Sequence, residues 1–181
     1  MRTVCRDIAK QRPVRQTGVS STVVDIMTKA KAVGVEIFLP VDSVTAGDAY
    51  GTSVVDCEDD LPSGVMELDC GPITRAINVS LIQTSGTIIW NGPIGRYEMK
   101  PFEAGSKHMM EDIVEATCNG ATTIVTGRDT VDMFKAHHRL HEVTHFNVWS
   151  EPFWNLLMDN RLLGIDTLSG PLQVWAMHLI P

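Results

Sequence analysis

The 181-residue sequence is poor in cysteine and has no long apolar run. Its four cysteines, Cys5, Cys57, Cys70 and Cys118, are scattered without a Cys-x-x-Cys pair. This spacing argues against a zinc knuckle or a disulfide framework and fits reduced, buried thiols in a cytoplasmic protein. No apolar run approaches the roughly 20 residues that span a bilayer, and the N-terminus lacks the apolar region of a secretory signal. We therefore expect no membrane partner and a cytoplasmic location.

Positive charge is scarce beyond the first twenty residues. Residues 1–20 hold the bases Arg2, Arg6, Lys10, Arg12 and Arg15 and the single acid Asp7. Their local charge is +4, and because the whole chain carries −7, the remaining 161 residues carry −11. Such an acidic body argues against nucleic acid as the main partner. A transit peptide and an RNA-binding arm are alternatives for the basic head, but we expect a solvated terminus.

Apolar periodicity alternates between helix and strand after residue 20. Helices are expected over residues 23–33, Ile73–Gln83, Pro101–Thr117 and Glu151–Met158, with another that begins near Asp129. Strands are expected at Val35–Leu39, Val65–Leu68, Ile88–Trp90, Thr122–Val125 and Val143–Val148. The polar stretch 42–64 is expected to be a surface loop with one short strand at Thr52–Val55. This alternation predicts an α/β fold with three layers, helix/sheet/helix, around a parallel Rossmann-like sheet of about five strands.

Three turns follow the predicted strands, and right-handed crossovers place all of them on the same rim of the sheet. They are DCGP at 69–72, NGP at 91–93 and TGRDT at 126–130. Ligands of open parallel sheets bind just outside the carboxyl ends of the strands. The rim is therefore the candidate site.

The segment TGRDT at the start of a helix suits a bound phosphate. Free N–H groups at a helix start attract anions, and Gly127 allows a close approach. Asp129 would then lie on the magnesium side and Thr130 would donate to phosphate. The alternative is that Asp129 is an ordinary N-cap. Arg128 either adds positive charge or blocks the approach.

Two further features each have a functional and a plain interpretation. Glu98 either accepts hydrogen bonds from ribose hydroxyls or is a solvated acid at a helix start. His137, His141 and His145 recur at four-residue spacing, but the last falls on a predicted strand, so the three would not share a helical face. No neighbouring cysteine or carboxylate pair completes a tetrahedral set. We expect no metal site at these histidines.

Taken together, six motifs resemble the phosphoglycerate kinase family in order and in spacing. They are LPVDSVTA at 39–46, ELDCGP at 67–72, IIWNGPIGRYE at 88–98, TGRDT at 126–130, VTH at 143–145 and LLGIDTLS at 162–169. The resemblance implies the later part of that enzyme's C-terminal, nucleotide-binding domain. It implies a glycolytic kinase, a transferase that moves phosphate between 1,3-bisphosphoglycerate and ADP.

The resemblance also implies a set of nucleotide-binding residues. The turn Asn91, Gly92 and Pro93 would lie against the nucleotide, and Glu98 would bind the ribose. Gly127, Arg128, Asp129 and Thr130 would form the phosphate loop for Mg-ATP or Mg-ADP, with Asp129 on the metal side. The site would thus hold a metal only through the nucleotide.

Three departures from the family pattern weaken this site. Thr126 and Arg128 flank a single Gly127 where the family has consecutive glycines, and their Cβ atoms would crowd the phosphate donors. Glu67 stands where the family has a glycine beside the adenine. The segment from Trp149 to Pro152 replaces a glycine-rich helix start, and Glu151 there would repel an anion.

The resemblance predicts three segments: a non-matching basic segment 1–20, a partial nucleotide-binding domain 21–169 and a non-matching tail 170–181. The acceptor domain, and the first strands of the nucleotide domain with their lysine, have no counterpart. We therefore expect the chain alone to be inactive as a kinase. Alternatives are a non-catalytic ATP- or ADP-binding module, and an interaction protein with a partner that covers the truncated sheet. An active kinase would need a companion chain.

Overall fold

The computed structural model describes residues 20–46, 52–56, 65–158, 160 and 162, and for Ser20 and the segment 52–56 it describes the backbone alone. The tail 170–181 and all but the last residue of the basic segment 1–20 lie outside the described residues. Among the described helices, none has the length and apolar character needed to cross a bilayer.

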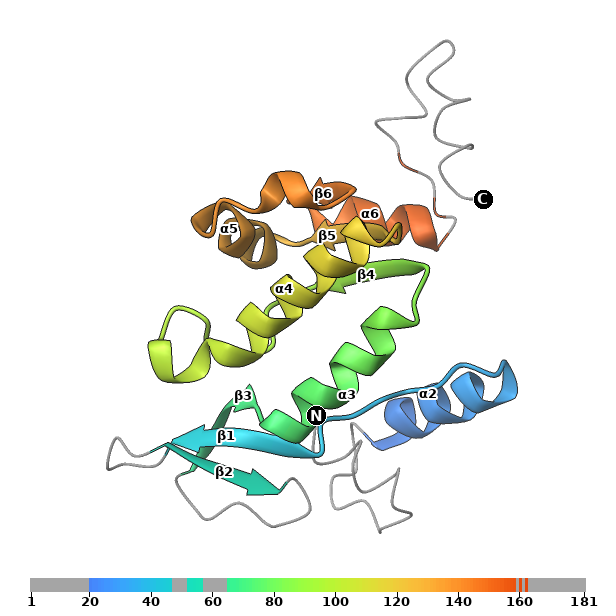
Figure 1. Cartoon of the computed structure of the whole chain (residues 1–181). Coiled ribbons are helices and arrows are strands. Elements are labelled where there is room, and N and C mark those ends of the chain that lie inside the picture. Colours follow the sequence, from blue (N-terminus) through green and yellow to red (C-terminus); the bar gives the residue numbers. More distant parts are fainter. Residues whose placement is uncertain (1–19, 47–51, 57–64, 159, 161, 163–181) are drawn as a thin grey trace.

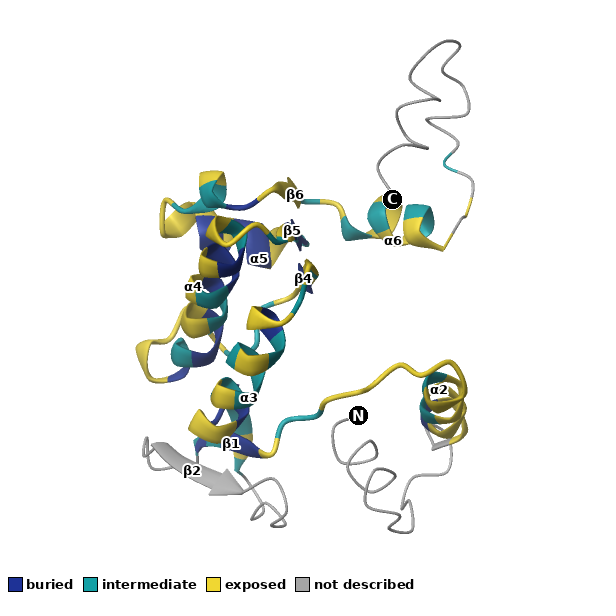
Figure 2. Cartoon of the chain, turned by 45° about the vertical axis from the view of Figure 1, so that its right-hand side comes forward, coloured by how far each residue is buried: buried dark blue, intermediate teal, exposed yellow. Residues whose placement is uncertain are grey.

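The first described element is helix α2, Ser20–Ala32. It ends at Ala32, close to the predicted end at residue 33, and is followed by Gly34, whose φ of +73° is readily adopted by glycine alone. Its apolar side chains are only partly covered, because Val23 is buried while Ile26 is 53% exposed. Helix α2 stands apart from the other helices (Figure 2).

A small antiparallel sheet follows, in the order β2-β1-β3. Strand β1 is Asp42–Ala46, β2 is Thr52–Asp56 and β3 is Met66–Cys70. The short strand predicted near Thr52 is confirmed, but the polar stretch from residue 42 also contains β1, which was predicted as loop. Strand β3 was correctly predicted as a strand, yet it pairs antiparallel with β1 rather than joining a parallel sheet.

The second sheet is parallel and has the order β4-β5-β6. Its strands are β4 Thr87–Asn91, β5 Thr122–Thr126 and β6 His145–Asn147. The helical elements around it are α3 Pro72–Gln83, η1 Lys100–Phe102, α4 Ala104–Cys118, α5 Arg128–Ala136, η2 Leu140–Glu142 and α6 Ser150–Leu157. Figure 1 shows α3 running between the two sheets. The predicted α/β class, with a parallel sheet flanked by helices, is confirmed.

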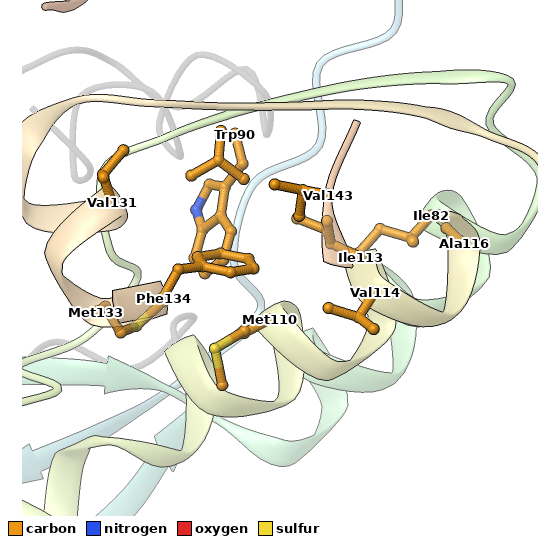
Figure 3. Packing of buried hydrophobic residues seen from close by; sticks show 11 residues of the cluster. Ile82, Trp90, Met110, Ile113, Val114, Ala116, Val131, Met133, Phe134 and Val143 are labelled. Atoms are coloured by element: carbon orange, nitrogen blue, oxygen red, sulfur yellow. The ribbon is translucent and has the colours of Figure 1, made fainter. Parts of the chain in front are cut away.

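The main core lies between the parallel sheet and helices α4 and α5 (Figure 3). Trp90 of β4 meets Phe134 of α5 edge to face, with ring centroids 5.7 Å apart. Met110 and Ile113 of α4 are each 1% exposed in the same cluster. Each such side chain stabilises the fold by about 1.5–3 kcal/mol through burial. This core fixes the carboxyl ends of β4 and β5 side by side.

The opposite face of the parallel sheet is less covered. Trp90 and Val125 alternate with Ile89 and Ile124 along the two strands, so the latter pair points away from α4 and α5. Ile89 is 39% exposed and Ile124 is half-buried. The strand predicted at Ile88–Trp90 is therefore present but is not buried along its whole length.

The predicted strand Val35–Leu39 is wrong. This segment is extended but belongs to no helix or strand, and its residues from Val35 to Phe38 are exposed. A strand needs a neighbour for its backbone N–H and C=O groups, and the described strands pair elsewhere. The parallel sheet therefore has three described strands rather than about five.

Candidate functional site

The turn after β4 is bonded directly to the start of α5. The backbone N–H of Gly92 donates to Thr130 Oγ1 at 2.8 Å, across 38 residues of sequence. Trp90 Nε1 donates to the carbonyl of Gly92 at 2.8 Å, which ties the turn to the buried indole. The NGP and TGRDT segments, predicted to share one rim, therefore form one structural unit.

Gly127 is required where β5 passes into α5. Its φ of +90° lies in the region that L side chains rarely adopt, and a Cβ there would lie 2.6 Å from Asn91 Oδ1. Gly127 is the N-cap residue, and α5 begins at Arg128 without a side-chain cap. The alternative in which Asp129 caps the helix is therefore wrong: Asp129 is exposed in the first turn.

One buried polar group beside the start of α5 has no partner among the described residues. The first N–H groups of any helix have no partner within that helix. Beside them, the hydroxyl of Thr126 is fully buried and has no hydrogen-bond partner among the described residues. Buried hydroxyls are normally paired, so this rim has spare donor capacity next to Asp129 and Thr130.

A groove of about 440 Å³ opens beside this rim. It is lined by Pro93, Gly95, Arg96, Tyr97, Glu98, Met99 and Asp129. The carboxylate of Glu98, predicted to bind the ribose, and that of Asp129, predicted to lie on the metal side of the phosphates, thus face a single groove. Burial raises the pKa of Tyr97 above its ordinary value of 10, and the nearby charges of Glu98 and Asp129 raise it further. The phenol therefore stays protonated and can donate a hydrogen bond at neutral pH.

Arg128 does not line the groove. Its guanidinium lies over the ring of Trp149, with Cζ 5.5 Å from the ring centroid, in a cation–π contact. Trp149, the N-cap residue of α6, is 66% exposed. Two of the departures noted in the sequence therefore contact each other beside the start of α5.

Glu67 also lies outside the groove lining. It is half-buried on β3, where its Oε1 accepts a hydrogen bond from Ser43 Oγ at 3.1 Å. This contact stabilises the pairing of β3 with β1. The described structure therefore gives Glu67 a place in the antiparallel sheet.

Asp69 is a key residue that sequence reasoning treated only as part of a turn. Its buried carboxylate accepts from the N–H of Gly105 at 2.7 Å and of Cys70 at 2.8 Å. Side chains at Gly95 or Gly105 would collide with it. Desolvation raises the pKa of Asp69, although these hydrogen bonds lower it in part. The sign of this role in the sequence was an acidic residue between Leu68 and Cys70, at the end of a strand.

The loop that carries Glu98 is thus held from two sides. Ser106 Oγ accepts from the N–H groups of Ile94 at 3.0 Å and Gly95 at 3.2 Å. The N–H of Arg96 donates to the carbonyl of Leu68 at 2.9 Å. These contacts place Glu98 beside the groove although Glu98 itself is exposed.

Asp42 is a second residue that the sequence did not single out. Its carboxylate accepts from the N–H of Thr74 at 2.7 Å, from Thr74 Oγ1 at 2.6 Å and from the N–H of Ile73 at 2.9 Å. It therefore caps α3 from a different element. Burial alone would raise the pKa of Asp42, but the bonds from Thr74 and Ile73 outweigh it and lower the pKa.

The other candidate sites have less support as functional sites. A groove of about 480 Å³ at the ends of α3 and α4 is lined by Asp112 and Glu115 and contains none of the predicted site residues. Within the described ranges, no group of three or more His, Cys, Asp or Glu side chains is placed to hold a metal ion. His137, His138 and His141 are exposed.

The fold defines an α/β protein of the class whose ligands bind at the carboxyl edge of a parallel sheet. The phosphoglycerate kinase family model matches residues 6–153. The chain is 38% identical over 148 residues to a probable phosphoglycerate kinase of Caenorhabditis elegans, which covers 80% of this chain and 36% of that protein. It is 37% identical over 155 residues to mouse phosphoglycerate kinase 2, covering 83% of this chain and 37% of that protein.

The solved phosphoglycerate kinase of Coxiella burnetii has the same fold. It aligns with a TM-score of 0.72 at 23% identity, over 87% of this chain and 42% of that chain. The chain belongs to the phosphoglycerate kinase family, a family of glycolytic kinases that use nucleotide substrates with Mg²⁺. It spans little more than a third of the length of the relatives named above.

Proposed function

We propose that the chain binds the ribose and phosphates of ADP or ATP, with the nucleotide's Mg²⁺, along the rim from Glu98 to the start of α5. The observation that carries this proposal is the 2.8 Å bond from the Gly92 N–H to Thr130 Oγ1. That bond brings the turn of β4 and the start of α5 together, with Glu98 and Asp129 on one groove.

Each residue has a role that its position supports. The Glu98 carboxylate is exposed to the groove and can accept hydrogen bonds from two ribose hydroxyls. The N–H groups at the start of α5, with Gly127 as N-cap, would face the phosphates. Asp129 would bind the Mg²⁺ that the nucleotide brings, since Mg²⁺ is commonly held by one or two carboxylates together with substrate phosphates. Asn91 and Pro93 would form the wall of the site.

Two features make the proposed binding weak. Arg128 lies in the first turn of α5, and its side chain packs over Trp149. A glycine at this position would leave the backbone N–H groups accessible. The site is also shallow, because Glu98 and Asp129 are both exposed. We propose a dissociation constant on the order of 1 mM, near −4 kcal/mol.

We further propose that the 181-residue chain alone does not catalyse the family reaction, the transfer of phosphate between 1,3-bisphosphoglycerate and ADP. Phosphoryl transfer depends on positioning and on charge stabilisation of the transferred group. The groove offers carboxylates to the nucleotide and has one cationic side chain in its lining, Arg96. A cluster of bases for the phosphorylated acceptor is absent from the described rim. In keeping with a glycolytic family, we propose a cytoplasmic location.

A thermal-shift titration with Mg-ADP tests the proposal. At ten times the dissociation constant, a ligand stabilises the folded state by about 1.4 kcal/mol, which raises the melting temperature by roughly 3–6 °C for a chain of this size. Glu98→Ala and Asp129→Ala should each reduce this shift. The matched control is Asp132→Ala, which removes an exposed carboxylate from the same helix outside the groove lining. An equal shift in all variants contradicts the proposed site.

A further inference from the structure

Arg128 and Trp149 lie at the end of the rim that is opposite to the groove. The strands of the parallel sheet have the order β4-β5-β6, and Figure 2 shows α6 beyond the end of β6. The groove is lined mainly by the loop after β4, the start of α5 follows β5, and Trp149 is the N-cap residue of α6, which follows β6. The guanidinium of Arg128, which lies over Trp149, is therefore on the side of the α5 start that faces away from Glu98.

A chain of phosphates would run along the rim in this same direction. This step rests on the nucleotide site proposed above, with the ribose at Glu98 and the phosphates at the first N–H groups of α5. A diphosphate ends at the start of α5, whereas a triphosphate extends one phosphate further, from the β5 position toward Trp149 at the β6 position. The third phosphate is therefore the part of a nucleotide that would reach Arg128.

The guanidinium of Arg128 is available for this contact. Arg128 is exposed, and its guanidinium lies over the ring of Trp149, which is itself 66% exposed, with Cζ 5.5 Å from the ring centroid. A cation–π contact at an exposed ring is weak. An arginine–phosphate pair with two parallel N–H···O bonds is among the stronger polar interactions of proteins. We therefore expect the guanidinium to leave the ring when a phosphate comes within its reach.

The charges around the rim make a cation at this place important. Glu98 and Asp129 line the groove, and Glu151 lies in the first turn of α6 beside Trp149. Each additional phosphate brings negative charge toward these carboxylates, so a longer phosphate chain is repelled more strongly unless a cation pairs with it. Arg128 is placed to supply that cation at the position of the third phosphate.

We propose that Arg128 is a specificity-determining residue that makes the rim prefer a nucleoside triphosphate to a diphosphate. When ATP binds, the guanidinium leaves Trp149 and pairs with the terminal phosphate. When ADP binds, the guanidinium stays on the ring, and the side chain only obstructs the backbone at the start of α5. Mg-ATP should therefore bind about tenfold more tightly than Mg-ADP.

Calorimetric titration of the 181-residue chain with Mg-ADP and with Mg-ATP measures this ratio of affinities. Arg128→Gln removes the charge but keeps a long polar side chain, and it should bring the ratio to about one, because the third phosphate loses its partner. Arg128→Lys keeps the charge without the planar fork and should give an intermediate ratio. The matched control is Lys135→Gln, which removes an exposed cation from the last turn of the same helix and should leave the ratio unchanged.

Trp149 provides a second measurement that follows the movement of the guanidinium. The indole N–H resonance of Trp149 can be identified in an NMR spectrum by its loss in Trp149→Phe. Saturating Mg-ATP should shift this resonance, because the cation leaves the ring, whereas saturating Mg-ADP should leave it in place. Trp149→Ala should raise the ratio of affinities further, since ATP no longer has to compete with the ring for the guanidinium.

The outcomes separate this inference from the nucleotide site on which it rests. Equal affinities of the original chain for the two nucleotides overturn the inference and leave the site intact, whereas the absence of binding by either nucleotide overturns both. A preference for ATP that survives Arg128→Gln, a ratio that falls in Trp149→Ala, or a resonance that ADP shifts as much as ATP does also overturns the inference. The comparison of the two nucleotides uses the unaltered chain, so a variant that fails to fold does not decide the result.

Discussion

The backbone N–H of Gly92 and the hydroxyl of Thr130 are joined by a 2.8 Å hydrogen bond between two turns that lie 38 residues apart. Thr130 is fully buried, so its hydroxyl is held in one direction. Because Gly92 follows β4 and Thr130 belongs to α5, this one bond sets the spacing of the proposed nucleotide site.

Thr130→Val should remove the bond while it preserves the shape of the side chain. The Gly92 N–H would lose its partner, which costs about 1–2 kcal/mol of unfolding free energy. Urea denaturation measures the loss. Thr84→Val is the control, because Thr84 is exposed and its hydroxyl bonds only to its own helix. Equal stabilities of the two variants would show that the bond contributes nothing.

Asp42→Ala should destabilise the chain by about 2–4 kcal/mol at pH 7, because it leaves the start of α3 without its charged cap. The pKa of Asp42 is lowered from 3.8 in the folded chain. Its contribution is therefore present above pH 3.8 and is lost as the pH falls through the lower folded value. Urea titrations at several pH values should show the gap between variant and original closing below pH 3.8. A gap independent of pH contradicts the assignment.

Arg128→Gly should tighten Mg-ADP binding, whereas Glu67→Gly should leave it unchanged, because Glu67 lies outside the groove lining. The first change removes the side chain that lies over Trp149 and opens the backbone at the start of α5. Calorimetric titration measures the affinities. Lys135→Gly, which removes an exposed cation from the other end of the same helix, is the control. Binding that is no tighter in Arg128→Gly refutes the predicted obstruction.

A coupled assay with 3-phosphoglycerate and MgATP should show no turnover from the isolated chain. The reason is the absence of acceptor-binding bases from the described rim. Activity that survives repurification and disappears in Asp129→Ala would prove this prediction wrong.

Cys70 should resist alkylation in the folded chain. Burial, together with the charge of Asp69, raises the pKa of its thiol to about 11, whereas Cys118 is exposed. Since the thiolate is the reactive form, iodoacetamide at pH 8 should modify Cys118 and leave Cys70 free. Mass spectrometry of peptides reads the result, with a sample in urea as the control. Equal modification of both cysteines before unfolding would contradict the structure.

Much of the parallel half of the fold was predictable from local sequence. Strands β4 and β5 combine β-branched residues with glycine turns, and α4 ends at Cys118, one residue beyond the predicted end at Thr117. Each of these elements presents apolar side chains to the core, so its own sequence pattern carries the information. The nearness of the NGP and TGRDT turns followed from the handedness of crossovers alone.

The errors concern elements whose structure depends on distant partners. Val35–Leu39 has the composition of a strand, but composition cannot reveal that no described strand lies beside it. Strand β1 is polar, and its pairing with β2 and β3 is set by register rather than by apolar pattern. Asp42 bonds to Thr74 across 32 residues and Asp69 to Gly105 across 36. The sequence marks Asp69 as an acid at the end of a strand, but it does not reveal which distant backbone group the acid binds.

The carboxylate of Asp69 belongs to the antiparallel sheet, yet it holds the first turn of the helix that covers the parallel one. The carbonyl of the preceding residue, Leu68, holds the loop of Glu98. The two sheets are therefore mechanically coupled, and neither can loosen without releasing the other's supports. Thermal unfolding should accordingly be a single cooperative transition, in which the candidate nucleotide site melts at the same temperature as the antiparallel sheet β2-β1-β3.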